Sequence, residues 1–292
     1  MVSIVVVGSA SMDLVVTANS RPKAGETLIG ESFQTVPGGK GANQAVAAAR
    51  LGADVSMIGR VGEDTFGEEI IDNLKGNGVS VDYVETVPQT ASGTAHITLA
   101  EGDNSIIVVK GANDEVSPSY LEKAVSILKK ADMIMVQQEI PEETIEYIAG
   151  FCKQFNKRWL LNPAPARRIS NEVIESATFL TPNEHEFAIM FGEEDRSKVL
   201  VRFPNKLLIT EGKNGVRYFN GINEEIVPAY TVEPVDTTGA GDTFNAAFAV
   251  AVAEGKQIAE ALRFANRAAS ISITKFGAQG GMPTREEVEG SI

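Results

Sequence analysis

The feature that most constrains the fold is a regular alternation of short apolar runs with amphipathic helical patterns. Residues 2–8 form a β-branched run that ends at Gly8, as a strand buried on both faces of a parallel sheet would. Similar runs recur at 54–60, 132–137, 158–162 and 206–210. Between them lie helical patterns, the clearest at 41–51 and 118–130. This alternation predicts an α/β fold: a doubly wound, mostly parallel sheet with helices on both faces.

Two segments break the alternation. Residues 13–36 and about 93–110 have short strand patterns and turn residues but no helical period. A small sheet carried on the loop after the first strand would project over the carboxyl ends of the main strands, where ligands bind in such folds. We therefore expect a single α/β domain over residues 1–292, with a β-sheet lid inserted at about 13–36 and 93–110. An ordinary edge hairpin is the alternative.

Charge and cysteine usage exclude some functions and compartments. The net charge is −13 and no long run of Lys and Arg occurs, so nucleic acid is not an expected partner. The single cysteine, Cys152, cannot form an internal disulfide and fits a reducing compartment. It lies at helical spacing from Ile148 and Phe155, which predicts a buried thiol. The N-terminal apolar run is too short to cross a bilayer and has no basic region before it, so we expect a cytoplasmic protein without a membrane partner.

The strongest chemical signal is residues 236–244, with the sequence Asp-Thr-Thr-Gly-Ala-Gly-Asp-Thr-Phe. A glycine-rich turn that opens a helix presents unpaired amides and a positive dipole end to an anion. Amides of Gly239, Ala240 and Gly241 could stabilise a moving phosphoryl group. Asp242 could then accept the proton of an attacking hydroxyl. A capped helix after a common Gly-Ala-Gly turn fits the spacing equally well. The segment is not a Walker loop, and no Gly-x-Gly-x-x-Gly follows the first strand, which disfavours a dinucleotide-dependent dehydrogenase.

Two motifs together resemble one known family. Residues 236–244 resemble the C-terminal signature of the ribokinase family of carbohydrate kinases. Residues 37–45, Pro-Gly-Gly-Lys-Gly-Ala-Asn-Gln-Ala, resemble its N-terminal signature. Residues 162–166 and 275–279 extend the similarity, which covers essentially the whole chain. The resemblance implies a kinase that uses ATP and Mg²⁺ to phosphorylate a primary hydroxyl of a small sugar, converting D-ribose to D-ribose 5-phosphate. It assigns Asp242 as the base and the Gly239–Gly241 amides as the anion hole.

The resemblance also implies a set of sugar-binding residues. They are Ser11, Asp13, Gly39, Lys40, Asn43, Glu139 and Asp242. Taken alone, Asn43 fits a helix-capping residue, and Glu139, shortly before Pro141, fits the entry to a helix. Ser11 departs from the family, which usually has Asn there, and a hydroxyl reaches less far than a carboxamide. The exact sugar therefore stays open, with fructose, 2-keto-3-deoxygluconate and adenosine as alternatives. A sugar sensor without catalytic activity is a further alternative.

Further residues are implied for the nucleotide and for cations. The nucleotide residues are Asn183, Thr210, Gly212, Gly215, Gly241 and Asn266. Glu186 is expected to bind Mg²⁺ through a water molecule, although the segment 181–186 alone predicts a capped surface helix. Family members are activated by a potassium-like ion held mostly by backbone carbonyls. The matching positions are Asp236, Thr238, Ser272, Lys275, Gly277 and Gly281. The resemblance also suggests a homodimer formed through the lid.

Overall fold

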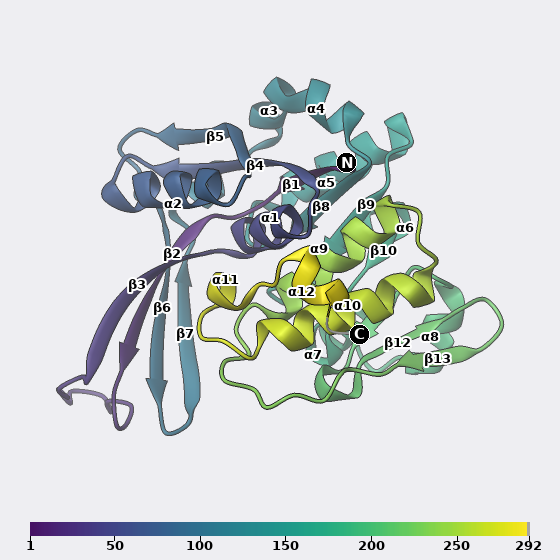
Figure 1. Ribbon diagram of the computed structural model, residues 1–292. Helices are drawn as coiled ribbons and strands as arrows, with labels where there is room; N and C mark the ends of the chain where they lie inside the picture. Colours follow the sequence, from purple (N-terminus) through teal and green to yellow (C-terminus); the bar gives the residue numbers. More distant parts are fainter. Residues whose placement is uncertain (291–292) are drawn as a thin grey trace.

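The main sheet is parallel and six-stranded in a computed structural model that describes residues 1–290. Its strand order is β10-β9-β8-β1-β4-β5, with β1 near the middle (Figure 1). The strands are β1 (Ser3–Val7), β4 (Asp54–Gly62), β5 (Ser80–Val87), β8 (Met133–Gln137), β9 (Trp159–Asn162) and β10 (Phe179–Leu180). Because side chains alternate along a strand, β1 contributes Ile4 and Val6 to one core and Val5 and Val7 to the other.

Helices cover both faces of this sheet. One face carries α1 (Lys40–Arg50), α2 (Thr65–Gly76), α9 (Ala240–Ala253) and α10 (Ile258–Ser272). The other carries α3 (Pro118–Leu121), α4 (Val125–Lys130), α5 (Glu142–Phe155), α6 (Asn171–Ser176), α7 (Glu184–Phe191) and α8 (Arg196–Arg202). The short helices α11 (Ala278–Gly281) and α12 (Arg285–Gly290) follow α10. The predicted doubly wound α/β fold is confirmed.

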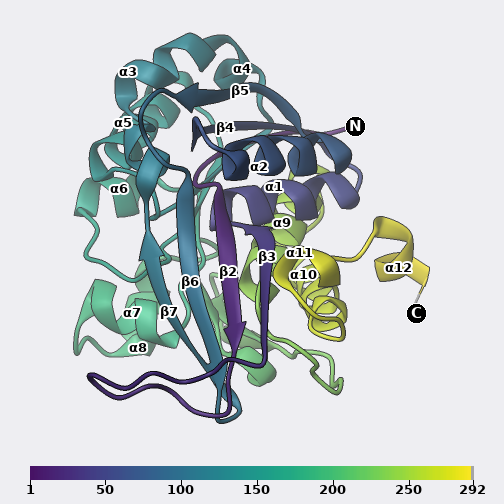
Figure 2. The same ribbon diagram turned by 90° about the vertical axis from the view of Figure 1, so that its left-hand side faces the viewer.

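A second, mixed sheet has four strands, and its strand β2 follows directly after the carboxyl end of β1 (Figure 2). Its order is β3-β2-β6-β7, with β2 (Ser11–Thr17), β3 (Ser32–Gly38), β6 (Gly93–Ala100) and β7 (Asp103–Val109). A two-residue turn joins β6 to β7, and its residues Glu101 and Gly102 have φ values of 58° and 74°. Val15, Ala95 and Ile97 form a small apolar cluster on one face of the sheet. The two segments that lacked a helical period thus contribute to one small sheet.

Three details differ from the sequence-based prediction. Residues 206–210 do not add a strand to the parallel sheet, because β11 (Leu208–Thr210) begins a separate antiparallel sheet with β12 (Val216–Phe219) and β13 (Glu224–Val227). The predicted helix 118–130 is interrupted by a 3-10 turn, Glu122–Ala124. Strand β5 was missed because only Val84 in it is fully buried, so no continuous apolar run marks it.

Within residues 1–290, no helix has both the length and the apolar character needed to span a membrane. Cys152 lies buried in α5, as its spacing predicted, and burial raises the pKa of its thiol to about 12.

Candidate active site

The candidate site lies where β1 and β8 end side by side. From this adjacent pair the chain continues to β4 on one side and to β9 on the other, which is the kind of switch point where ligands bind in open α/β sheets. Ser9 follows β1 and donates its hydroxyl hydrogen to Oε2 of Glu139, which follows β8. The backbone N–H of Lys40 donates to the same oxygen at 3.0 Å. Glu139 therefore joins β1, β8 and the start of α1, and it lies outside α5, whose N-cap is Pro141.

The turn before α1 requires glycine. Gly39 has a φ of 89°, and a Cβ there would lie 2.8 Å from the backbone nitrogen of Ser11. A Cβ on Gly38 would lie 2.4 Å from Oδ1 of Asp13. The two glycines thus let the start of α1 lie directly against β2. Gly39 is the N-cap of α1, so the interpretation of Asn43 as a capping residue is wrong.

Asp242 is buried in the first turn of α9. Its side chain does not cap the helix, because the N-cap is Gly239, with a φ of 77°. Instead Oδ2 accepts a hydrogen bond from Nδ2 of Asn43 at 3.0 Å, and Oδ1 accepts one from Nε2 of Gln44 at 3.0 Å. Burial raises the pKa of Asp242, while the charge of Lys40 and these two hydrogen bonds oppose the rise. The arrangement fixes the carboxylate beside the first amides of the helix.

Several charged groups converge around Asp242. Burial, followed by the negative charges of Glu139 and Asp242, raises the pKa of Asp13 to about 7. Burial alone would lower the pKa of Lys40, but the surrounding carboxylates outweigh it and raise that pKa. The side chain of Lys40 therefore stays positively charged among these carboxylates. A site with one partly buried cation, several carboxylates and helix-terminal amides suits a polyhydroxyl ligand next to a phosphate.

A cavity of about 520 Å³ opens between the four-stranded sheet and the turn before α9. This volume is in the range of small-molecule sites. Its lining combines polar groups with an apolar wall. The polar groups include Asp13, Thr237 and Thr238, and the wall includes Val15, Ile97 and Phe276. Ser11 does not line this cavity and is buried in β2 beside Gly39.

Of the predicted nucleotide residues, Gly241 lies in the first turn of α9 and Asn266 in α10, whereas the others lie around β11 and the start of α7. Asn183 is the N-cap of α7 and forms a capping box with Glu186, in which each side chain accepts the other residue's backbone N–H at 2.8 Å. The capped helix predicted from the segment alone is therefore confirmed. Glu186 is nonetheless buried, and burial raises its pKa. The backbone N–H of Thr210 donates to the carbonyl of Pro182 at 2.9 Å, which places the end of β11 next to this cap.

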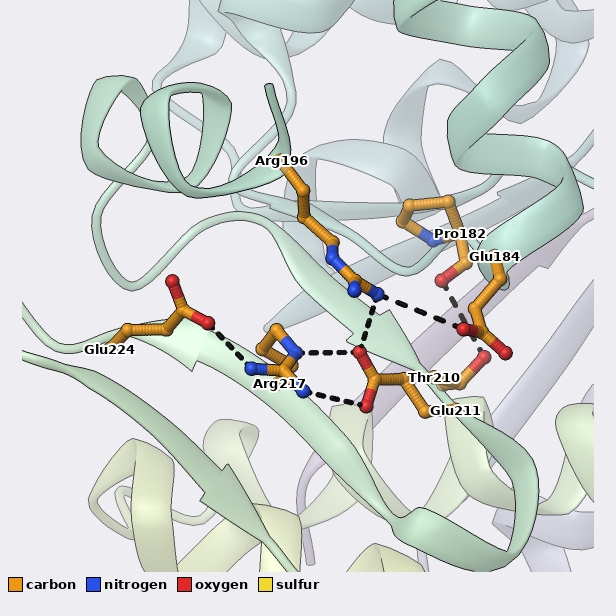
Figure 3. A network of polar contacts seen from close by, with 7 residues as sticks. All are labelled: Pro182, Glu184, Arg196, Thr210, Glu211, Arg217 and Glu224. Carbon is orange, nitrogen blue, oxygen red and sulfur yellow. Dashed lines mark hydrogen bonds and ion pairs between the residues drawn. The ribbon is translucent and has the colours of Figure 1, made fainter. Parts of the chain in front are cut away.

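An ion-pair network around the buried side chain of Glu211 supports the turn after β11 (Figure 3). The Glu211 side chain is 4% exposed and contacts Arg196 at 2.8 Å and Arg217 at 2.6 Å. Arg217 also bonds Glu224, so the network ties the turn to both β12 and β13. Sequence reasoning missed it. The available signal was an acid directly before Gly212 at the end of a buried strand.

The turn after β11 and the end of β13 are held together by Gly215 and Asn266. Gly212 lies in a 3-10 turn with a φ of 53°, and Gly215 has a φ of 99°. A Cβ on Gly215 would lie 2.0 Å from the carbonyl oxygen of Val227, so only glycine fits. Asn266, in α10, donates to that same carbonyl at 2.9 Å and to the carbonyl of Pro228 at 3.0 Å. The structure thus brings Gly215 and Asn266 together at the end of β13.

The positions matched to the monovalent cation lie in two adjoining segments, the turn before α9 and the stretch from the end of α10 to the end of α11. Asp236 accepts the N–H and hydroxyl of Thr238, and its second oxygen accepts the N–H of Gly277 at 2.9 Å. A Cβ on Gly281 would lie 1.9 Å from the carbonyl oxygen of Ser272. The Lys275 side chain points elsewhere, to Glu287. For residues 1–290, no group of three or more His, Cys, Asp or Glu side chains is arranged to hold a metal ion.

Two buried amides near Asp242, Gln44 and Gln279, were not among the predicted site residues. Gln44 donates to Asp242 and to Oδ1 of Asn162, and it accepts from Gln137 at 2.7 Å. Gln279 donates to Asn43 at 3.0 Å. Gln44 is fully buried among the alanines of α1, and a glutamine in that position was the signal that could have identified it.

Comparisons with known proteins agree on one family. The family described as pfkB family carbohydrate kinase matches residues 1–285. The chain is 64% identical to a ribokinase of Bacillus subtilis (strain 168), over 98% of each chain. It is 49% identical to a ribokinase of Lactococcus lactis subsp. lactis (strain IL1403), covering 100% of this chain and 97% of that one. Among solved structures, Arabidopsis thaliana ribokinase complexed with ribose and ATP superposes with a TM-score of 0.91 at 36% identity, covering 99% of this chain and 98% of that one.

Proposed function

The chain belongs to the pfkB family of carbohydrate kinases, and on this premise we propose that it transfers the γ-phosphoryl group of ATP to D-ribose, forming D-ribose 5-phosphate. One observation carries the proposal: the Asp242 carboxylate is fixed by two amides directly beneath the N-terminal turn of α9. A base and an anion-binding turn then lie on the same helix end, as transfer of a phosphoryl group to an alcohol requires.

In the proposed reaction, Asp242 accepts the proton of the sugar's primary hydroxyl. A carboxylate is a weak base toward an alcohol, whose pKa is about 15–16, like that of water. The proton therefore transfers late, after the oxygen has begun to bond to phosphorus. The amides of Gly239, Ala240 and Gly241 stabilise the charge on the phosphoryl oxygens. Gly241 suits this position because a Cβ there would meet nothing within 4 Å, so the turn is open to a ligand.

The sugar hydroxyls are assigned to the polar groups at the carboxyl ends of β1 and β8. Asp13 and Glu139 accept hydrogen bonds from these hydroxyls, and Asn43 can both donate and accept. Lys40 and Gly39 line the proposed sugar site. Each of these groups is at least partly buried, and an unpaired buried polar group costs about 1–3 kcal/mol, so a ligand rich in hydroxyls is favoured. Ser11 provides a shorter polar contact than the asparagine usual in the family.

ATP is assigned to the region that joins Asn183, Thr210, Gly212, Gly215 and Asn266. Mg²⁺ would neutralise charge on the transferring phosphates. Among the residues named, Glu186 fits it best through a bound water, because one of its oxygens already caps α7 and a single carboxylate cannot form a cage. Most Mg²⁺ ligands would then be phosphate oxygens and water.

A potassium-like activator is assigned to the loops that contain Asp236, Thr238, Ser272, Lys275, Gly277 and Gly281. Their adjacency supports the assignment, since an ion held by carbonyls depends on loop shape. Replacing K⁺ by Na⁺ at constant ionic strength should lower the rate. An equal rate in both salts would remove this assignment.

The four-stranded sheet is proposed to act as a lid over the sugar and to pair with a second copy of the chain, in a cytoplasmic homodimer. Its edge strand β7 exposes four consecutive apolar residues, among them Ile107 at 70% and Val109 at 52%, and β3 exposes Phe33 at 63%. An open edge with such residues favours association. Light scattering at micromolar concentration should give a dimer, and Ile107→Lys should give a monomer. A wild-type monomer would contradict the assignment.

The activity itself is tested by ADP release over a panel of acceptors: D-ribose, 2-deoxy-D-ribose, D-fructose, 2-keto-3-deoxygluconate and adenosine. D-Ribose should give the highest kcat/KM. If another acceptor gave the highest kcat/KM, the assignment as a kinase would stand and the proposed substrate would change. ATP turnover with none of them would favour a sugar sensor.

A further inference from the structure

Gln279, in α11, makes a hydrogen bond from each end of its carboxamide. Its Nε2 donates to Oδ1 of Asn43 at 3.0 Å, and its Oε1 accepts from Nδ2 of Asn73, in α2, at 2.7 Å. Asn43 in turn donates to Asp242 at 3.0 Å. Gln279 is therefore one step removed from the proposed base. It has no direct hydrogen bond to Asp242.

The same series of bonds extends away from the site and has one direction. Asn77 donates to the backbone carbonyl of Asn73 at 2.8 Å and more weakly to its Oδ1 at 3.4 Å, and Arg50 donates from Nε to Oδ1 of Asn77 at 3.0 Å. A guanidinium can only donate and a carboxylate can only accept. With these two ends fixed, each amide between them must turn its oxygen toward Arg50 and its nitrogen toward Asp242.

Burial makes these orientations matter. Gln279 and Asn43 are each 5% exposed, so water does not readily replace a lost partner. Arg50 also donates to the backbone carbonyl of Gln279, which holds the residue at both its main chain and its side chain. The neighbouring residue Ala278 lies against Gly239, where a Cβ would be only 2.8 Å away. Helix α11 consequently contacts both the anion-binding turn and the amide that grips the base.

We propose that Gln279 is a positioning residue for phosphoryl transfer, which holds the Asn43 carboxamide so that its N–H points at Asp242. If Asn43 turned over, its oxygen would face the carboxylate and repel it. Asp242 would then be protonated more readily and would lose a fixed orientation. This inference rests on the proposed role of Asp242 as the base.

The test measures kcat and kcat/KM for D-ribose against pH in Gln279→Leu, which removes both hydrogen bonds without adding charge. Without the hydrogen bond from Gln279, Asn43 should no longer be held as a donor to Asp242. The acid limb of the profile should then move to a pH about one unit higher, and kcat should fall about tenfold. The KM for ATP should stay at the wild-type value. Gln279→Glu should shift the limb further, because it cannot donate to Asn43 and adds a negative charge. The matched control is Gln257→Glu, the same change at an exposed glutamine that caps nothing with its side chain, and it should leave the profile unchanged.

An acid limb that stays at the wild-type pH in Gln279→Leu would overturn the inference. Such an unchanged limb could also come with a lower Tm and a rise in the KM values for both ATP and D-ribose. The latter result would assign Gln279 to packing alone. If the wild-type protein released no ADP with D-ribose, the proposed function would fail first, and this inference with it.

Discussion

Gln44 and Asp242 lie 198 residues apart in the sequence, yet Nε2 of Gln44 donates to Oδ1 of Asp242 at 3.0 Å. The preceding residue of the same helix, Asn43, donates to the other carboxylate oxygen. Helix α1 thus holds both oxygens of the proposed base, and a partial rotation of the carboxylate would break at least one of the two hydrogen bonds. A base that is held in this way suits a reaction in which positioning and charge stabilisation supply most of the acceleration.

Binding of D-ribose should depend on the ionisation of Asp13. The pKa of Asp13 is raised to about 7, so in the free protein the carboxyl group is increasingly protonated below that pH. If the ionised form accepts the sugar hydroxyls, the affinity should fall about tenfold from pH 8 to pH 6. Titration calorimetry with D-ribose checks this, and Asp13→Asn should bind weakly with a flat pH dependence. An affinity in the wild type that is equal at both pH values would contradict the assignment.

Gly239→Ala should disable catalysis by moving the first turn of α9. An alanine at a φ of 77° is strained by roughly 1–2 kcal/mol, and its Cβ would also lie 2.8 Å from Ala278. The turn must shift, and a displacement of about 1 Å can cost roughly a hundredfold in rate, so kcat should fall by about that factor.

Gly255→Ala is the matched control for this change. Gly255 lies just beyond the other end of α9 and has a φ of 89°, but a Cβ there would meet nothing within 4 Å. It should lower stability by a similar strain energy and leave kcat unchanged. Equal losses of kcat in the two variants would show that the close contact at Gly239 is unimportant.

Arg217→Leu should destabilise the proposed nucleotide turn. It leaves the 4%-exposed Glu211 side chain with Arg196 as its remaining cationic partner. Removing one partner of a fully buried pair costs roughly 3–5 kcal/mol, and the partial exposure of Arg217 together with the remaining Arg196 pair should reduce this to about 2 kcal/mol. The KM for ATP should rise, whereas that for D-ribose should not. Urea unfolding and steady-state kinetics give the two quantities.

The control for Arg217→Leu breaks an equally close but exposed pair. Lys256 and Glu260 lie 2.7 Å apart, and their side chains are 31% and 51% exposed. Lys256→Leu should change the free energy of unfolding by about 0.5 kcal/mol at most. A cost for Arg217→Leu as small as this would mean that the ion pairs of Glu211 do not stabilise the turn.

Local patterns predicted much of this molecule. The β-branched run at 2–8 gave a central strand because parallel strands buried on both faces need continuous apolar residues. Strand β5 has no such run, since it lies at the edge of the sheet, and the antiparallel pairing of β11 depends on contacts distant in sequence. Local periodicity therefore could not predict strand β5 or the pairing of β11.

The site shows the same division. Glycine-rich turns identified the starts of α1 and α9, because those turns demand positive φ at Gly39 and Gly239. The partners of Asp242 were only half foreseen. Asn43 was assigned to the sugar site, whereas Gln44 and Gln279, although they stand in the matched segments 37–45 and 275–279, gain their roles from hydrogen bonds that form only after the chain has folded.

The central claim is that Asp242 acts as the base on a bound sugar hydroxyl, and Asp242→Asn tests it most directly. Single-turnover ADP formation with saturating ATP and D-ribose should be almost abolished, while calorimetry should show both ligands bound with affinities close to those of the wild type. A turnover rate within tenfold of the wild-type rate would contradict the account.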